Sequence, residues 1–258
     1  MAISLRSRRE IELLRQAGAV VAGVLSKLKE MIEPGVSTGE LNEIAEEITA
    51  AHGAAGLFKG VRSPYAKYPF PAVICSSVND QVVHGIPSRG VILRKGDILS
   101  IDYGCRLDGY CGDAAITVPV GAVSDENARL IDVTRHVLDM AVEMSKPGVA
   151  WSRIAGSVEA YVRRAGFSVV RDYVGHGIGK EMHEEPRVPN FVSDELLAAD
   201  IILKEGMILA VEPMINAGGC EVKTLKDGWT VVTRDGRCSA HFEHTIAIVK
   251  GGCEVLTL

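Results

Sequence analysis

The sequence lacks the features that mark secreted, membrane-spanning and nucleic-acid-binding chains. It has no uncharged apolar run of about 18 or more residues, so no membrane-spanning helix is expected. The opening stretch MAISLRSRREIELLRQAG has no apolar segment followed by a small-residue cleavage site, which argues against a secretory signal. Basic residues (28) do not outnumber acidic residues (33), whereas a nucleic-acid partner favours a basic excess. We therefore expect a cytoplasmic protein without a membrane or nucleic-acid partner.

Cysteine pairs are also absent. The six cysteines are scattered and none forms a C-x-x-C motif, so we interpret them as free thiols. A chain of 258 residues, 47% of them hydrophobic, can bury a substantial core without disulfides or a structural metal. Any metal site is therefore expected to serve function rather than folding. The short basic cluster Arg6, Arg8 and Arg9 is interpreted as the solvated start of a helix rather than as a docking patch.

Hydrophobic periodicity predicts two similar series of helices and strands. Apolar residues at helical spacing predict a helix from about Ser7 to Ile32. Ser37 and Glu40 form a capping-box motif that opens a second helix ending near Gly53. Further helices are predicted at 125–144 and 151–164, a loop at 54–72, and strands at 72–76, 97–103, 114–120, 167–170, 207–211, 220–222, 229–232 and 241–249. This order predicts an α+β fold with two halves of similar layout.

Two aspartates flank a predicted β-hairpin. Asp102 ends one strand in LSIDYG, and Asp113 begins the next in YCGDAAIT. If Gly104–Gly112 is the connection, the two carboxylates can face each other from neighbouring strands. A buried carboxylate pair repels unless a cation lies between the groups. Alone, the pair is weak evidence for a site, because aspartates on the surface of a hairpin are commoner than a buried pair.

Two histidines follow in VGHGIGKEMHEEP. His176 lies between glycines, which we expect to let the backbone turn sharply and bring the imidazole to a ligand. His183 comes seven residues later. A single histidine is more often a core or surface residue than a ligand. Two histidines in one glycine-rich loop make a ligand role about as well supported as a structural one.

Two glutamates occur within apolar strands. Glu212 lies in MILAVEPM and Glu243 lies in AHFEHTIAI. An unpaired carboxylate in a core strand is rare because removing its charge from water costs several kcal/mol. The alternative to a metal is a buried ion pair, but no basic residue lies close to either glutamate in the sequence.

Together these residues form a candidate metal-ligand set of four carboxylates and one imidazole. Such a set suits divalent ions such as Mn, Fe, Co or Mg better than thiol-preferring ions. Four carboxylates also provide enough charge and bridging oxygens to hold two ions, as in two-metal hydrolytic sites. The set is Asp102, Asp113, His176, Glu212 and Glu243.

With these residues in place, the chain resembles the type I methionine aminopeptidases of the pita-bread fold, metallopeptidase family M24. The resemblance runs from about Ile11 to the C-terminus, in the family's order and spacing. It rests on the segments NDQVVHGIP, SIDYG, GDAAIT, GHGIGKEMHEEP, AVEPM, KDGWT and FEHT. It implies an α+β pita-bread fold with two pseudo-symmetric halves around antiparallel sheets. It also implies one catalytic domain, 1–258, with a short N-terminal lead-in at 1–6.

The resemblance implies the reaction and the role of each ligand. The activity would be removal of the initiator methionine from nascent proteins whose second residue is small. A hydroxide activated by two divalent ions (Co, Mn, Fe or similar) would attack the first peptide carbonyl. Asp113 and Glu243 would bridge the ions, and Glu212 would also act as proton shuttle. His183 would stabilise the developing oxyanion, and His84 would contact the amide nitrogen of the second residue.

The resemblance also places the methionine side chain in an apolar pocket. The residues implied to line it are Tyr65, Phe70, Cys75, Met182 and Trp229. The loop RSPYAKYPFP departs from the family spacing, so Tyr68 is an alternative to Tyr65, and Met182 stands where an aromatic residue is common. His241 replaces a frequent amide two residues before Glu243 and is expected to adjust that ligand.

The remaining implications concern partners and rivals. The resemblance implies nascent N-termini at the ribosome as partners, a monomer, and a monovalent cation near Asn79 and Ser239. One rival is a proline dipeptidase or aminopeptidase P on the same fold, although those relatives usually carry an extra N-terminal domain. The other is a non-catalytic binding protein, although such relatives generally lose metal ligands.

Overall fold

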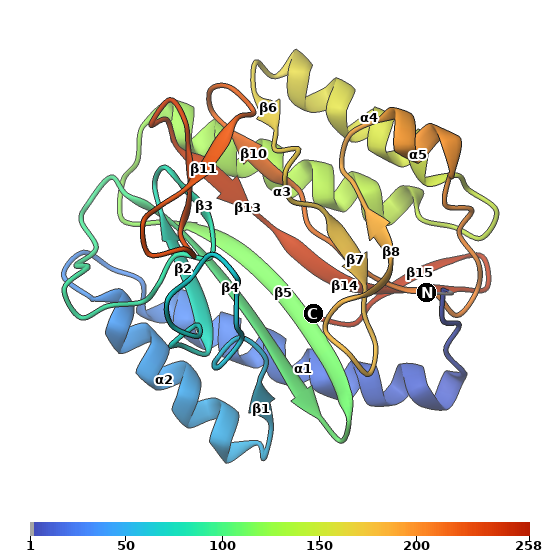
Figure 1. Ribbon diagram of the computed structural model, residues 1–258, viewed down its shortest axis with the longest axis horizontal. Coiled ribbons are helices and arrows are strands. Elements are labelled where there is room, and N and C mark those ends of the chain that lie inside the picture. The colour runs from blue at the N-terminus through green and yellow to red at the C-terminus, as the bar shows by residue number, and fades with distance from the viewer. Residues whose placement is uncertain (1–2) are drawn as a thin grey trace.

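The computed structural model describes residues 3–258, and the two predicted series of elements are visible in Figure 1. The helices are α1 (Arg8–Met31), α2 (Thr38–Ala51), α3 (Asp125–Met144), α4 (Trp151–Arg164) and α5 (Asp194–Ala198). In Figure 1, helices α1 and α2 lie in the lower part of the view, and α3 and α4 lie in the upper part. Within residues 3–258, no helix combines the length and apolarity needed to cross a bilayer.

The four long helices begin where the sequence predicts. Ser7 and Ser37 cap α1 and α2, and each accepts a hydrogen bond from the backbone of a glutamate three residues later, Glu10 or Glu40, whose side chain bonds back. Both capping boxes satisfy backbone N–H groups that have no partner within the helix. The predicted bounds of α3 and α4 are confirmed, whereas α5 is too short to have been predicted by periodicity.

Strands occupy most of the remaining chain. Their bounds are β1 (Ala55–Gly56), β2 (Ile74–Val78), β3 (Gln81–Val83), β4 (Ile98–Leu107), β5 (Tyr110–Pro119), β6 (Ser168–Val169), β7 (Gly175–Gly177), β8 (Glu184–Val188), β9 (Ile208–Val211), β10 (Met214–Asn216), β11 (Val222–Thr224), β12 (Val231–Thr233), β13 (Ser239–His241), β14 (Glu243–Val249) and β15 (Gly252–Val255). Nine form an antiparallel sheet in the order β1-β4-β5-β14-β9-β7-β8, with β2 on β4 and β15 on β14. Two three-stranded sheets, β13-β10-β6 and β11-β12-β3, complete the structure.

Each half of the molecule buries its own core. One core joins α1 and α2 to β4 and β5 and includes Leu28, Leu41 and the fully buried Tyr103. The other joins α3 and α4 to β9 and β14, with Trp151 fully buried and its indole N–H donating to the Pro189 carbonyl at 2.7 Å. The large sheet spans both cores, so a site at its middle is held by packing from both halves.

Three local expectations are corrected. The connection between the aspartate strands is only the turn at Asp108 and Gly109, because β4 and β5 continue pairing up to Leu107 and Tyr110. His176 lies in strand β7 and not in a loop. Its neighbours Gly175 and Gly177 do not form a turn: a Cβ on either would lie 2.3 or 2.2 Å from a backbone oxygen, so they allow close strand packing.

The interpretation of Arg6 as a solvated residue is also wrong. Only 11% of its side chain is exposed, and its guanidinium forms an ion pair with Glu184. The error arises because the partner lies 178 positions away, where no local pattern can reveal it. Arg8 and Arg9 are exposed as expected.

Candidate metal centre and active-site cavity

Most of the predicted ligands lie on one face of the nine-stranded sheet, in two rows across its strands. In the first row, Cys75 of β2 faces Asp102 of β4, which faces Ala115 of β5. Ala115 in turn faces Glu243 of β14. Glu212 directly follows β9, whose register with β14 brings it beside Glu243. Because paired residues of antiparallel strands project to the same side, these carboxylates converge on one space, and the small alanine leaves it open.

The second row runs beside the first. Gly104 faces Asp113, and a Cβ at Gly104 would lie 2.9 Å from Asp113 Oδ1, so the glycine makes room for the carboxylate. The Asp113 N–H donates to Thr245 Oγ1 at 3.1 Å, and that hydroxyl donates to the Asp113 carbonyl at 2.8 Å. Thr245 faces Ala210, which faces His176. Small side chains therefore separate the ligands in this row as well.

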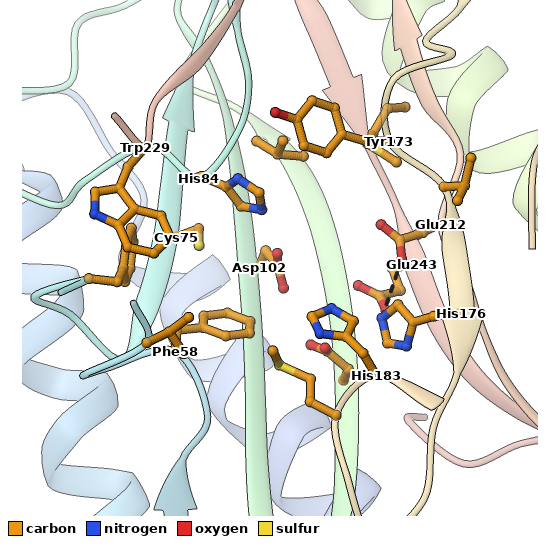
Figure 2. A pocket seen from close by; sticks show the side chains of 17 residues that line it. Phe58, Cys75, His84, Asp102, Tyr173, His176, His183, Glu212, Trp229 and Glu243 are labelled. Atoms are coloured by element: carbon orange, nitrogen blue, oxygen red, sulfur yellow. Dashed lines mark ion pairs between the residues drawn. The ribbon is translucent and has the colours of Figure 1, made fainter. Parts of the chain in front are cut away.

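The structure brings all five predicted ligands to one cavity. Figure 2 labels Asp102, His176, Glu212 and Glu243 around it. Donor atoms of Asp113, His176 and Glu243 lie within 4.8 Å of one another. His176 Nε2 lies 3.5 Å from Glu212 Oε1. Asp102 lines the same cavity from the side of β4.

Burial sets the electrostatics of the four carboxyl groups. Burial raises the pKa of Asp102 to about 7. Burial and then repulsion by Asp102 raise the pKa values of Asp113 and Glu212 well above the usual range. Burial and then repulsion by Asp113 do the same to the pKa of Glu243. Four carboxylates in such a site are stable only in the presence of compensating positive charge.

The donor set fits divalent metal ions. Asp102 Oδ1, Asp113 Oδ1 and Glu243 Oε1 are buried and have no hydrogen-bond partner among the described residues. A buried polar atom without a partner is costly, and these three all border the same cavity. No Lys or Arg forms an ion pair with Glu212 or Glu243 within residues 3–258, so a buried ion pair with a basic side chain does not explain them. Oxygen-rich ligands with one imidazole suit hard and borderline divalent ions.

Two further histidines border the cavity. His183 lies beside His176, with ring centroids 4.4 Å apart and the planes at 73°. His84 stacks edge-on against Tyr173 at 5.5 Å. Burial lowers the pKa of His84 and of His176 to about 4, and partial burial lowers the pKa of His183. All three imidazoles are therefore neutral near pH 7, so each can donate one ring N–H.

His241 approaches Glu212 and forms no ion-pair contact with Glu243 among the described residues, so the expectation that it adjusts Glu243 is corrected. Its side chain is buried, and Nε2 is 3.8 Å from Glu212 Oε2. Thr117 fixes its backbone, because the Thr117 hydroxyl accepts from the His241 N–H and donates to the His241 carbonyl. His176 therefore lies next to one carboxylate oxygen of Glu212, and His241 lies next to the other.

The apolar end of the cavity contains four of the five residues predicted for the methionine pocket. These are Phe70, Cys75, Met182 and Trp229. The rings of Phe70 and Trp229 meet edge-to-face at 5.3 Å. The whole cavity has a volume of about 240 Å³, with the carboxylates at one side and the aromatic wall at the other (Figure 2).

Tyr65 is the exception, and Tyr68 does not replace it. Both lie outside the cavity and are 85% and 67% exposed. Gly60 donates to Phe70 O and Phe70 to Val61 O, both at 2.8 Å, so the chain is pinched at the base of this loop. Residues 62–69, between these hydrogen-bonded positions, extend into solvent, so Tyr65 and Tyr68 lie away from the cavity.

Sequence reasoning missed several residues of the cavity wall. Phe58 comes before the loop and is buried against Phe70, so it adds an aromatic ring to the cavity wall. The aromatic residue in LFKG was the available signal for it. Val83, Tyr173 and Met214 also line the cavity. Val83 and Met214 lie within the segments NDQVVHGIP and AVEPM, next to predicted site residues, whereas no motif marked Tyr173.

Comparison with known proteins agrees with this geometry. The profile of metallopeptidase family M24 matches residues 12–250. The chain is 47% identical over 252 residues to methionine aminopeptidase 1 of Bacillus subtilis, covering 98% of each chain. It is 41% identical to the methionine aminopeptidase of Escherichia coli strain K12, covering 100% of this chain and 95% of the relative.

Solved structures show the same relationship. The methionine aminopeptidase of Thermotoga maritima superposes with a TM-score of 0.93 at 39% identity, covering 99% of both chains. The Xaa-Pro dipeptidase of Bacillus anthracis superposes with a TM-score of 0.73 at 23% identity, and this chain spans 61% of it. The latter likeness shows a shared pita-bread fold and no more. The chain belongs to metallopeptidase family M24, among its methionine aminopeptidases.

Proposed function

We propose that this protein is a metal-dependent aminopeptidase that removes the initiator methionine from newly made proteins whose second residue is small. The observation that carries the proposal is the shared cavity: five metal-ligand candidates on one side and an apolar wall on the other. Full-length likeness to methionine aminopeptidases supports the same activity.

The proposed cofactor is a pair of divalent ions such as Co, Mn or Fe. Asp113, His176 and Glu243 would hold the ions, because their donor atoms lie within 4.8 Å of one another. Asp102 and Glu212 are proposed to complete the ligand set from opposite sides. When bound, the ions supply Lewis acidity and lower the pKa of water, so that a nucleophile is available near neutral pH.

The protein's own groups are proposed to act on the peptide and its protons. Neutral His183 donates a hydrogen bond to the carbonyl oxygen as negative charge develops there. Glu212 carries the proton from the nucleophile towards the leaving amine, and His84 contacts the amide nitrogen of the second residue. His84 suits this role because its low pKa keeps the ring neutral near pH 7.

The apolar wall is proposed to select methionine. Phe58, Phe70 and Trp229 provide aromatic contacts, and the thioether of Met182 adapts to the side chain that enters. The Cys75 thiol lies at the junction with the carboxylates, and burial raises its pKa well above the usual range, so it stays protonated. Tyr65 and Tyr68 have no part in this pocket.

Two neighbouring features belong to the proposal. His241 is proposed to hold Glu212 through Nε2, and we expect His241→Gln to keep manganese affinity while His241→Phe lowers it in calorimetric titration. A monovalent cation near Asn79 and Ser239 is proposed from the resemblance. The Asn79 carbonyl there already accepts from the Ser239 N–H at 2.8 Å, so a cation would use its second lone pair.

The substrate class also defines where the protein works. Newly made N-termini are present in the cytoplasm as chains leave the ribosome, and we propose that the protein acts there as a monomer. Its six free cysteines are compatible with a reducing compartment.

A peptide panel tests the proposed substrate class. We expect release of free methionine from Met-Gly-Ser, slower release when a bulky residue replaces glycine, and no cleavage of acetyl-Met-Gly-Ser. The prolidase-type substrate Ala-Pro-Gly should remain intact. Cleavage of Ala-Pro-Gly in preference to Met-Gly-Ser would overturn the assignment in favour of the proline-specific relatives.

A further inference from the structure

The segment that precedes α1 contacts both the turn before β9 and the start of β8, the strand that pairs with β7. The Arg6 backbone N–H donates to the Gly206 carbonyl at 2.7 Å, in the turn before β9. The Arg6 guanidinium Nη2 lies 2.6 Å from Glu184 Oε1 and 2.5 Å from Oε2. Both side chains are largely buried, with 11% and 17% of their surfaces exposed. Figure 1 shows the N-terminal end of the chain reaching this side of the molecule before α1 begins.

Glu184 uses the same carboxylate to close a turn. Its Oε1 accepts the backbone N–H of Lys180 at 2.9 Å and of Glu181 at 3.3 Å. The turn that it closes leads directly into His183, the residue before Glu184. The position of the imidazole therefore depends on a carboxylate whose charged partner is Arg6.

Close packing fixes the turn from its other side. A Cβ at Gly179 would lie 2.2 Å from Arg6 Nη2 and 2.7 Å from Glu184 Oε1, so the guanidinium presses against the turn. The Gly179 carbonyl accepts the Cys111 N–H of β5 at 2.8 Å. The turn is held between the guanidinium and the strand that carries Asp113.

We propose that Arg6 is a positioning residue that acts through Glu184 to hold His183 at the cavity. The proposal rests on the proposed function, since His183 is given the oxyanion role there. A charge-assisted pair that uses both carboxylate oxygens restricts geometry more than a single contact does. Small displacements of a catalytic group reduce rates steeply, so this remote contact has a measurable effect on turnover.

The first experiment compares three variants with the parent protein loaded with manganese. Arg6→Met keeps the length of the side chain and removes the ion pair, and it should lower kcat on Met-Gly-Ser on the order of tenfold. Arg6→Lys restores the charge and should recover part of the loss. Arg9→Met is the matched control, because Arg9 is exposed and has no ion pair among the described residues, and it should match the parent.

The second readout does not depend on activity. The amides of Lys180 and Glu181 donate to Glu184, so we expect their hydrogen exchange to become about tenfold faster in Arg6→Met and to stay unchanged in Arg9→Met. Unchanged exchange in Arg6→Met would overturn the proposal even if the parent protein shows no aminopeptidase activity. Parent protein without turnover, but with faster exchange in the variant, would instead contradict the proposed function alone.

A double-mutant cycle separates positioning from general damage. If Arg6 acts through His183, adding Arg6→Met to His183→Ala should cause no further loss of kcat. Arg6 would not act through His183 if Arg6→Met lowered kcat as much in the His183→Ala background as in the parent. The same would follow if Arg6→Met alone raised KM and left kcat unchanged. Manganese affinity measured by calorimetry should be the same in parent and Arg6→Met.

Discussion

His183 provides the clearest test at the scale of single residues. It lines the cavity beside His176 and is not among the three residues whose donor atoms cluster. We expect His183→Ala to lower kcat on Met-Gly-Ser by about 10²- to 10³-fold, as for loss of one oxyanion donor. Manganese binding measured by calorimetry should be nearly unchanged. Parallel loss of metal and activity would instead make His183 a ligand.

The apolar wall gives a second prediction at this scale. Phe58→Ala removes a buried ring that lines the cavity and should raise KM for Met-Gly-Ser, because methionine loses part of its contact surface. Tyr65→Ala is the matched control, since that ring is 85% exposed and lies outside the cavity. We expect steady-state kinetics to show an effect of Phe58→Ala and none of Tyr65→Ala. The reverse order would mean that the loop closes over the substrate.

The same two residues show what could be predicted one residue at a time. The five ligand candidates stood out in the sequence because charged groups within apolar or glycine-rich stretches need a specific partner. Phe58 and Tyr65 could not be sorted that way, since an aromatic residue in a loop is compatible with either position. The two backbone hydrogen bonds that pinch the loop at Phe70 decide the matter, and they depend on three-dimensional contact.

At the scale of elements, the glycine opposite Asp113 has a defined task. A Cβ at Gly104 would come within 2.9 Å of Asp113 Oδ1, and the flexible carboxylate could move aside at little cost in stability. We therefore expect Gly104→Ala to weaken manganese binding by at least about tenfold while the melting temperature changes little. The control Gly252→Ala, in strand β15 with no atom within 4 Å of the new methyl group, should bind manganese like the parent. Equal affinities in all three proteins would show that Asp113 does not hold the metal in this rotamer.

Long helices were predictable, whereas several short strands, β7 and β10 among them, were not. α1 to α4 carry apolar stripes over many turns, and three of them begin with a serine whose side chain caps the helix. Strands such as β7 and β10 have three residues each, too few for an alternating pattern to appear. His176 consequently seemed to lie in a loop, although the register with Ala210 is what aims its ring at the cavity.

At the scale of the whole molecule, the buried carboxyl groups make stability depend on pH when the metal is removed. The pKa of Asp102 is about 7 in the folded protein, against an ordinary value of 3.8. Between these values the folded state holds a proton that the unfolded chain has released, so the free energy of unfolding falls as pH rises. The raised pKa values of Asp113, Glu212 and Glu243 act in the same direction.

The buried histidines have the opposite effect at lower pH only. His84 and His176 have lowered pKa values of about 4, so they cost stability as pH falls below the ordinary value of 6.5. Above about pH 6.5 the histidines no longer affect how the free energy of unfolding changes with pH, and only the carboxyl groups do. We expect the melting temperature of chelator-treated protein to fall between about pH 6.5 and 8, and excess manganese to raise it most at the upper end. Calorimetry that shows metal-free protein gaining stability over this range would contradict the assigned pKa shifts.

The central claim concerns the whole site: metal bound by the five ligands makes the protein an aminopeptidase. The most direct measurement titrates metal-stripped protein with manganese while bound metal and methionine released from Met-Gly-Ser are recorded together. The account predicts no turnover without metal, turnover that rises with occupancy, and weakened binding with lost activity in Asp113→Asn, which removes a carboxylate proposed to hold the metal. Turnover by fully stripped protein, or full metal occupancy without turnover for any divalent ion, would contradict it.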